Sequence, residues 1–182
     1  MRVQDYDSVP SSIREFSVAA PEFFNWGFDV VDVWGKEKGD HQAIVYTDDD
    51  GNAIRNSFSE VVRKTGQLAY YFVNQGLKKG DSVLSMFPSA PALWLAVVAL
   101  IKVGVVIVPS APTQTPKDLE YGISRAGVKG VVTDANDVKK VPEVFDRDRG
   151  RLWFLARTGT NDHAPTPSGW ADLTSIQGES SS

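Results

Sequence analysis

Hydrophobic and polar positions along the chain alternate between two periods. Short runs rich in β-branched residues are predicted as strands at residues 82–87, 105–108, 130–133 and 151–155. The segments between them carry apolar residues at helical spacings of three and four. Strands separated by single helices indicate right-handed βαβ units. We therefore predict an α/β fold with a mainly parallel, doubly wound sheet covered on both faces.

The first part of the pattern predicts a helix followed by an N-terminal β-hairpin. Residues 42–47 and 53–58 are predicted as strands on either side of Asp50-Gly51, a pair that favours a tight turn. Residues 21–37 carry a stripe of large apolar side chains at spacings of three and four, which we expect to pack in the core. The stripe consists of Phe23, Trp26, Val30, Val33 and Trp34.

Several helix ends carry recognisable signals. The run SFSE at residues 57–60 is a capping box, in which Ser57 and Glu60 satisfy the first free amides of a helix. Thr115-Pro116 opens a further helix, and Gly127 closes it. These signals fix where the predicted helices start and stop.

The most apolar stretch, residues 90–109, is predicted as a helix that ends at Gly104 and leads into a strand. Ser89 is the expected N-cap, and Lys102 suits the negative pole at the C-terminal end of the helix. The alternative is a membrane helix, which needs about 20 apolar residues. The glycine stop and the lysine favour the globular interpretation.

Composition excludes several classes of function. The 182 residues are 42% hydrophobic and contain no cysteine, so we expect no disulfide or thiolate metal site. The two histidines, His41 and His163, lie far apart, which argues against a zinc or Ser-His-Asp site. With a formal charge of −4 and no basic run, we expect no nucleic-acid partner. The N-terminus lacks the apolar core of a signal peptide, so a cytoplasmic location is expected, with the mitochondrial matrix as an alternative in a eukaryote.

No phosphate-binding loop follows a predicted strand, although doubly wound sheets often bind nucleotides. Neither GxGxxG nor GxxxxGK[ST] occurs in the sequence. The segment Thr158-Gly159-Thr160 resembles a phosphate loop in composition, but no lysine follows it. We assign no catalytic or metal-binding residue in this chain.

Six motifs in register resemble AMP-forming adenylating enzymes, in particular medium-chain acyl-CoA synthetases. FFNWGFDVVD at residues 23–32 resembles the FNxAxDVxD opening, NSFSEV at 56–61 the TFxEL motif, and IKVGVVIVP at 101–109 the LKAGxxxxP motif. LKKGD, TPKDLEY and GVVTD match the same family in order and spacing. The resemblance implies the N-terminal subdomain of the adenylating-enzyme fold. It also implies an enzyme that uses ATP, Mg²⁺ and CoA to convert a carboxylic acid to acyl-CoA, AMP and pyrophosphate.

The resemblance also divides the chain into an N-terminal extension (1–20), an α/β subdomain (21–155) and a segment (156–182) leading to the family's phosphate loop. That loop and the C-terminal lysine of the family are not in this sequence, so we expect the chain alone to bind no cofactor and to be inactive. In the family, the loop after the second-motif strand borders the coenzyme A tunnel. By this resemblance Thr113 and Gln114 are candidate CoA-contacting residues, and an ordinary strand-to-helix loop is the alternative.

Two classes of function follow. The first is an N-terminal fragment of an acyl-CoA synthetase, whose expected partners are the remainder of that enzyme or further copies of the chain. The second is a free-standing, non-catalytic α/β module that docks to a protein or binds a small molecule. The sequence does not specify the acid.

Overall fold

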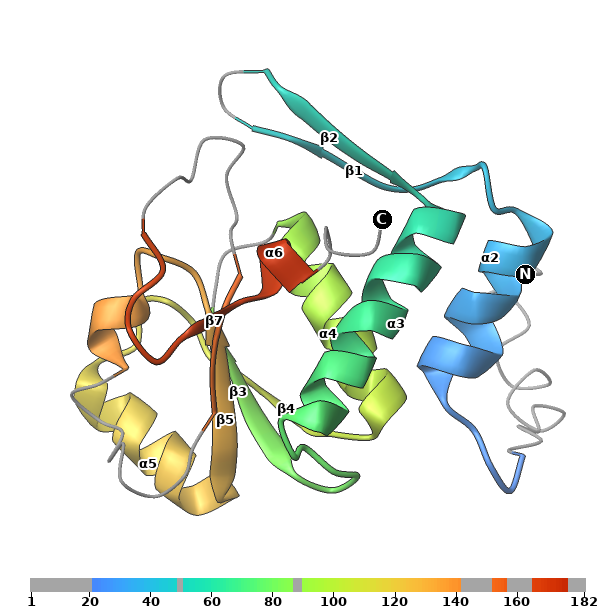
Figure 1. Ribbon diagram of the computed structural model, residues 1–182. Helices are drawn as coiled ribbons and strands as arrows, with labels where there is room; N and C mark the ends of the chain where they lie inside the picture. Colours follow the sequence, from blue (N-terminus) through green and yellow to red (C-terminus); the bar gives the residue numbers. More distant parts are fainter. Residues whose placement is uncertain (1–20, 49–50, 87–89, 142–151, 157–164, 177–182) are drawn as a thin grey trace, which may run out of the picture.

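A parallel sheet forms the centre of the molecule in the computed structural model, which describes residues 21–48, 51–86, 90–141, 152–156 and 165–176. Its strand order is β4-β3-β5-β6-β7, and every pairing is parallel (Figure 1). The α/β class and the parallel sheet are therefore confirmed. The strands are β3 (Ser82–Met86), β4 (Val106–Pro109), β5 (Val128–Thr133), β6 (Leu152–Leu155) and β7 (Ala171–Asp172).

Helices cover both faces of this sheet. Alternate strand residues point to opposite sides, so each face packs through its own set of side chains. On one face Val83, Val132 and Phe154 pack with the residues of α3 (Phe58–Asn74) and α4 (Pro91–Val103). On the other face their neighbours Leu84 and Val131 pack against α5 (Pro116–Ala126) and η3 (Val138–Lys140). The doubly wound arrangement is confirmed.

The predicted hairpin is also confirmed, and it forms a separate two-stranded sheet. Strands β1 (Gln42–Thr47) and β2 (Ala53–Ser57) pair antiparallel and project beyond α3 (Figure 1). Gly51 has a φ of 84°, which suits the predicted turn, whereas Asp50 lies outside the described residues.

The first helical segment differs from its prediction. It consists of η2 (Gly27–Asp32), a π-helix, followed by the short α2 (Val33–Glu37). The predicted core stripe is wrong: Trp26 and Trp34 remain 45% and 41% exposed, and Phe23 is 83% exposed. The wider π-helical turn changes which side chains share a face, so Gly27 and Val31 are the residues buried in η2.

Most predicted helix ends are confirmed. Ser57 and Glu60 form the capping box of α3, and Thr115 forms a second one with Asp118. Gly104 ends α4 in the left-handed region with a φ of 82°. The start of α4 is a correction, because Ala90, not Ser89, is its N-cap and supplies no side-chain hydrogen bond. No helix in the described part of the chain has the length and apolar character needed to span a bilayer.

The last described segment joins the sheet. Strand β7 pairs with β6, and α6 (Leu173–Ile176) contacts α3. Trp170 packs edge-on against Trp153 with ring centroids 5.1 Å apart, and Trp170 and Leu173 are both buried. These two buried residues anchor the segment. The domain boundary at residue 156 stays a prediction.

Candidate functional site

The order of the strands creates a switch point at the carboxyl ends of β3 and β5. Strand β4 lies on one side of β3 and β5 on the other, and the connecting helices α4 and α5 cover opposite faces. In open α/β sheets, the crevice at such a point is the usual place for a ligand. Here Thr133 Oγ1 joins the two strand ends by donating to the carbonyl of Met86 at 2.6 Å.

The loop after β4 carries the two residues that the sequence indicated. The amide of Ser110 donates to Ser85 O at 2.9 Å, and Gln114 N donates to Ala111 O at 3.0 Å, which closes a turn. Thr113 is exposed at the tip of this turn. Gln114 is half-buried, and its Oε1 atom is buried without a hydrogen-bond partner. Gln114 thus has a buried acceptor without a hydrogen-bond partner in the loop after β4.

Lys140 of η3 connects this loop to the segment after β5. Its ammonium donates to Pro112 O at 2.5 Å and pairs with Asp137 at 2.6 Å. The Asp137 side chain is 7% exposed and that of Lys140 is 39% exposed. We call Thr113, Gln114, Asp137 and Lys140 the carboxyl-end site.

The side chain of Asp134, at the end of β5, is buried and already accepts hydrogen bonds from the backbone. Its Oδ1 atom accepts from the backbone amides of Asn136 at 3.0 Å and Asp137 at 3.1 Å. A carboxylate that accepts hydrogen bonds from two backbone amides stabilises the turn that leads into η3. Asp134 therefore shapes this turn, and its Oδ1 atom is committed to the backbone.

The carboxyl-end site contains polar groups, some of which are already committed to other protein groups. Thr113 presents an exposed hydroxyl, and the Gln114 Oε1 atom is buried without a partner. The Lys140 ammonium is engaged by a carbonyl and a carboxylate. Among the described residues, no group of three or more His, Cys, Asp or Glu side chains could hold a metal ion. The carboxyl-end site provides no nucleophile paired with a base.

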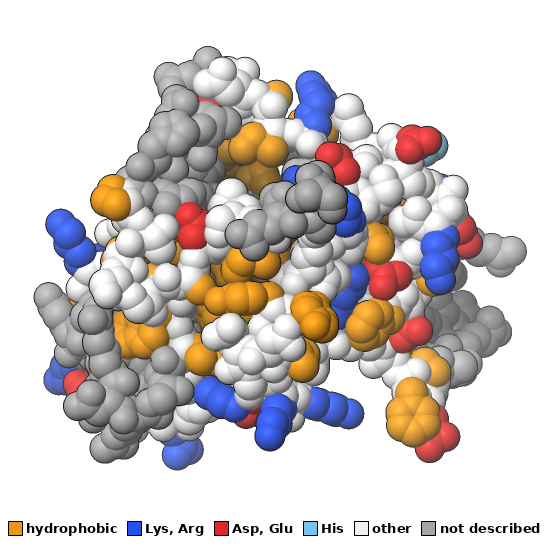
Figure 2. Space-filling view, in the orientation of Figure 1, with side chains coloured by type: hydrophobic (Ala, Val, Ile, Leu, Met, Phe, Trp, Pro, Cys, Tyr) orange, Lys and Arg blue, Asp and Glu red, His pale blue; other side chains and the backbone are white. Residues whose placement is uncertain are grey.

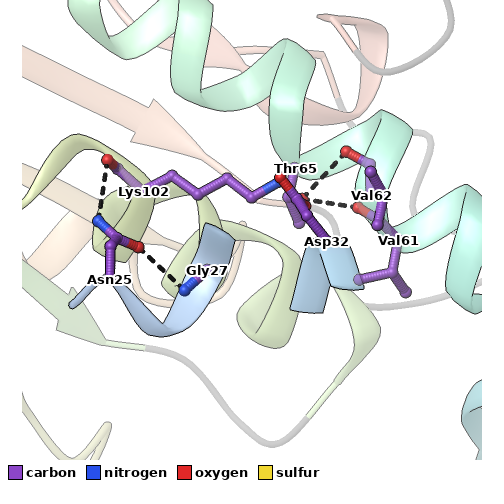
Figure 3. A network of polar contacts seen from close by, with 7 residues as sticks. All are labelled: Asn25, Gly27, Asp32, Val61, Val62, Thr65 and Lys102. Atoms are coloured by element: carbon purple, nitrogen blue, oxygen red, sulfur yellow. Dashed lines mark hydrogen bonds and ion pairs between the residues drawn. The ribbon is translucent and has the colours of Figure 1, made fainter. Parts of the chain in front are cut away.

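Sequence reasoning missed a second polar cluster, formed by Asn25, Asp32 and Lys102 (Figure 3). The Lys102 ammonium lies 2.6 Å from Asp32 Oδ1, and the two side chains are 2% and 22% exposed. From the sequence, the position of Lys102 was explained only by the negative pole at the C-terminal end of the helix. In the fold it is a buried ion-pair partner of η2, and the ring of Phe28 lies 5.6 Å from its Nζ atom.

Asn25 fastens the same two elements through its amide. Its Nδ2 atom donates to Ile101 O at 2.8 Å and to Lys102 O at 3.3 Å, and its Oδ1 atom accepts from Gly27 N at 2.9 Å. Asn25 and Asp32 belong to the first quoted motif and Lys102 to the third. The motifs were the signal that could have found this cluster. It joins η2 to the end of α4, and its role is structural.

Comparisons with known proteins match most of the chain. The family model described as AMP-binding enzyme matches residues 31–174. The mitochondrial acyl-coenzyme A synthetase ACSM5 of Rattus norvegicus is 34% identical over 119 residues, which cover 62% of this chain and 21% of the relative. The mitochondrial acyl-coenzyme A synthetase ACSM3 of Mus musculus is 32% identical over 141 residues, which cover 72% of this chain and 24% of the relative.

Solved structures share the fold. An acyl-CoA synthetase of Brucella canis aligns with a TM-score of 0.77 at 18% identity, over 98% of this chain and 33% of that one. A benzoate CoA ligase of Burkholderia xenovorans aligns with a TM-score of 0.68 at 17% identity, over 86% of this chain and 29% of that one. The chain thus matches the N-terminal part of acyl-CoA synthetases and spans between a fifth and a third of the length of these proteins.

Proposed function

Because the chain belongs to the AMP-binding enzyme family, we propose that it forms the N-terminal part of an AMP-forming acyl-CoA synthetase. The parent enzyme would convert a carboxylic acid, ATP and CoA to acyl-CoA, AMP and pyrophosphate. The observation that carries this proposal is the match to acyl-CoA synthetase relatives, 32% identical over 72% of this chain. The cytoplasm is the proposed location, and the mitochondrial names of these relatives support the matrix as the alternative.

Within that enzyme, the carboxyl-end site would border the path of coenzyme A. The exposed Thr113 hydroxyl can donate a hydrogen bond to the pantetheine arm or accept one from it. The buried, unpartnered Gln114 Oε1 atom can accept one from an amide N–H once its side chain turns out of the loop. Lys140 keeps the loop in place through Pro112. These residues would position CoA, and they would not take part in bond making.

We propose that ATP and Mg²⁺ bind to the remainder of the synthetase. In the carboxyl-end site the one ammonium, that of Lys140, is committed to Pro112 and Asp137. Stabilising charge on a transferring triphosphate requires cationic and backbone donors that are aimed at it. We therefore assign both cofactors to the remainder of the synthetase, which is the proposed partner of this part, and expect the chain alone to be inactive.

The test has two arms. In the first, the purified chain is assayed for acid-dependent ATP–pyrophosphate exchange with short- and medium-chain acids, and we expect the rate of a protein-free blank. Turnover above that blank would overturn the assignment of ATP to the remainder. In the second, the transcript from the source cell is sequenced beyond the codon for Ser182. A stop codon there would favour the alternative, a free-standing docking module.

The CoA role of Gln114 needs a separate measurement in the full-length parent. Gln114→Leu keeps the size of the side chain and removes its acceptor. We expect a higher KM for CoA and unchanged acid-dependent pyrophosphate exchange, because the exchange assay contains no CoA. An unchanged KM would leave the loop as an ordinary connection.

A further inference from the structure

The most exposed hydrophobic surface of the described chain lies at its first residues. Phe23, Phe24, Trp26 and Phe28 are 83%, 59%, 45% and 51% exposed. Figure 2 shows hydrophobic side chains at the surface at its lower right, where the described chain begins in Figure 1, with an acidic side chain beside them. We call these four residues the aromatic surface.

This surface surrounds a hollow of about 700 Å³ between the start of η2 and the end of α4. Its lining includes the four aromatic residues and the turn around Gly104. Trp26 also lines a neighbouring apolar groove of about 370 Å³ with Val45 and Trp94, both of which are about half exposed. The aromatic surface therefore borders two hollows and continues towards the hairpin.

Its area is that of an interface. Fully exposed aromatic side chains present 150–250 Å² each, so the four exposed fractions correspond to roughly 450 Å² of aromatic surface. The largest apolar patch on a typical monomer is about 300–600 Å² and is often functional. A standard interface buries about 800 Å² on each partner, of which a little over half is apolar. The aromatic surface alone supplies that apolar share.

The charges around the hollow are self-complementary. Glu22 and Asp29 line it with Lys79, and Asp29 also receives the amide of Asn25 at 2.6 Å. In a two-fold symmetric interface each copy presents the same patch, so an acidic wall on one copy can face a basic wall on the other. Two copies of a rim that carried charges of only one sign would repel each other in that arrangement.

We infer that the aromatic surface is a homodimer interface, in which Glu22 of one copy faces Lys79 of a second copy across a two-fold axis. Aromatic residues in the centre with charged residues at the rim are the usual composition of such interfaces. Dimerisation requires no catalytic activity and is independent of the proposed function.

The test is sedimentation velocity of the full chain at about 1–100 μM, a range that brackets a micromolar Kd. We expect a reversible dimer, and Phe23→Asp should raise its Kd at least about tenfold, as expected for a central aromatic residue. Phe23 is 83% exposed, so its replacement leaves the fold intact, which circular dichroism checks. The matched control is Tyr121→Asp on α5, also an exposed aromatic residue, which should leave the Kd unchanged.

Charge reversal identifies the pairing itself. Lys79→Glu and Glu22→Lys should each weaken the dimer about threefold or more, and the double variant should regain most of the affinity. Because the chain has no cysteine, Phe24→Cys adds a single thiol that should crosslink two copies, whereas Tyr121→Cys should not.

Three results would overturn the inference. They are a monomer at every concentration, a dimer that Phe23→Asp leaves unchanged, and an association that Tyr121→Asp weakens as strongly. The charge-reversal variants keep the test decisive if Phe23→Asp fails to fold.

Discussion

The ammonium of Lys102, in the last turn of α4, lies 2.6 Å from the carboxylate of Asp32 at the end of η2. The two residues are 70 positions apart in the sequence. Their burial is unequal, since 2% of the Lys102 side chain and 22% of the Asp32 side chain are exposed. The ion pair therefore fixes η2 to α4 from inside the protein. Because the burial is unequal, we expect removal of the two charged groups to lower the free energy of unfolding by different amounts.

Removing the carboxylate should cost more than removing the ammonium. Asp32→Asn leaves a buried charge without its counterion, so we expect the free energy of unfolding to fall by about 3 kcal/mol. Lys102→Met leaves a carboxylate that water still reaches, so the loss should be about 1–2 kcal/mol. Urea denaturation measures both values.

The matched control is the more exposed pair of Lys129 and Asp81, whose side chains are 37% and 25% exposed. Lys129→Met should cost about 1 kcal/mol or less. If Lys102→Met proved costlier than Asp32→Asn, the asymmetry of burial would not control the energy of the buried pair.

The contrast between local and distant contacts explains what the sequence could predict. The capping box at Ser57, the second cap at Thr115 and the left-handed stop at Gly104 all depend on neighbours within a few positions. Such signals can be read directly from residue types and spacing. The order of helices and strands followed from them, and so did the fold class.

Contacts between distant segments could not be read in this way. Periodicity placed Trp26 and Trp34 on a buried face because it assumed an α-helical turn, whereas η2 is a π-helix. The bond from Lys140 to Pro112 spans 28 positions, so no local pattern indicates it. For the candidate site, the resemblance supplied Thr113 and Gln114, and only the fold shows that an acceptor of Gln114 is buried without a partner.

Asn25 offers a prediction about local opening. Asn25→Asp replaces an amide that donates to Ile101 O and Lys102 O by a carboxylate facing the same carbonyl oxygens. We expect the free energy of unfolding to fall by about 2 kcal/mol, and Asn25→Ala to cost about 1 kcal/mol. Hydrogen exchange should accelerate across residues 25–37 before it does in α3. Uniform acceleration across the whole chain would contradict a role limited to holding η2.

The loss of folding stability at acid pH should depend on Asp81. The side-chain hydrogen bond from Lys129, together with the amide of Lys78, lowers the pKa of Asp81 below its ordinary value of 3.8. A lowered folded-state pKa stabilises the protein above the unfolded-state pKa, and this stability is lost as pH falls through the folded-state value.

We therefore expect Asp81→Asn to be less stable than wild type at pH 6 and the difference to shrink as pH falls below 3.8. Lys129→Met should reduce the same pH dependence, because it removes the largest cause of the shift. Unfolding titrations at a series of pH values measure this. If the difference in free energy of unfolding between wild type and Asp81→Asn stayed constant over this pH range, the Lys129–Asp81 ion pair would not cause the loss of stability at acid pH.

Two glycines should respond in opposite directions to the same substitution. Gly104 has a φ of 82°, and a Cβ there would lie 3.0 Å from Lys79 Cγ and 3.3 Å from Lys79 Cβ. Gly104→Ala should therefore destabilise the protein by more than about 1 kcal/mol, because the left-handed backbone conformation disfavours alanine and Lys79 leaves too little space for a Cβ atom.

Gly66 lies inside α3, and a Cβ added there would meet no atom within 4 Å. Gly66→Ala should stabilise the protein by about 1 kcal/mol, since alanine has the higher helix propensity. Thermal and urea unfolding of both variants measure the two effects, and equal shifts in the same direction would contradict the assignment of Gly104 as the left-handed end of α4.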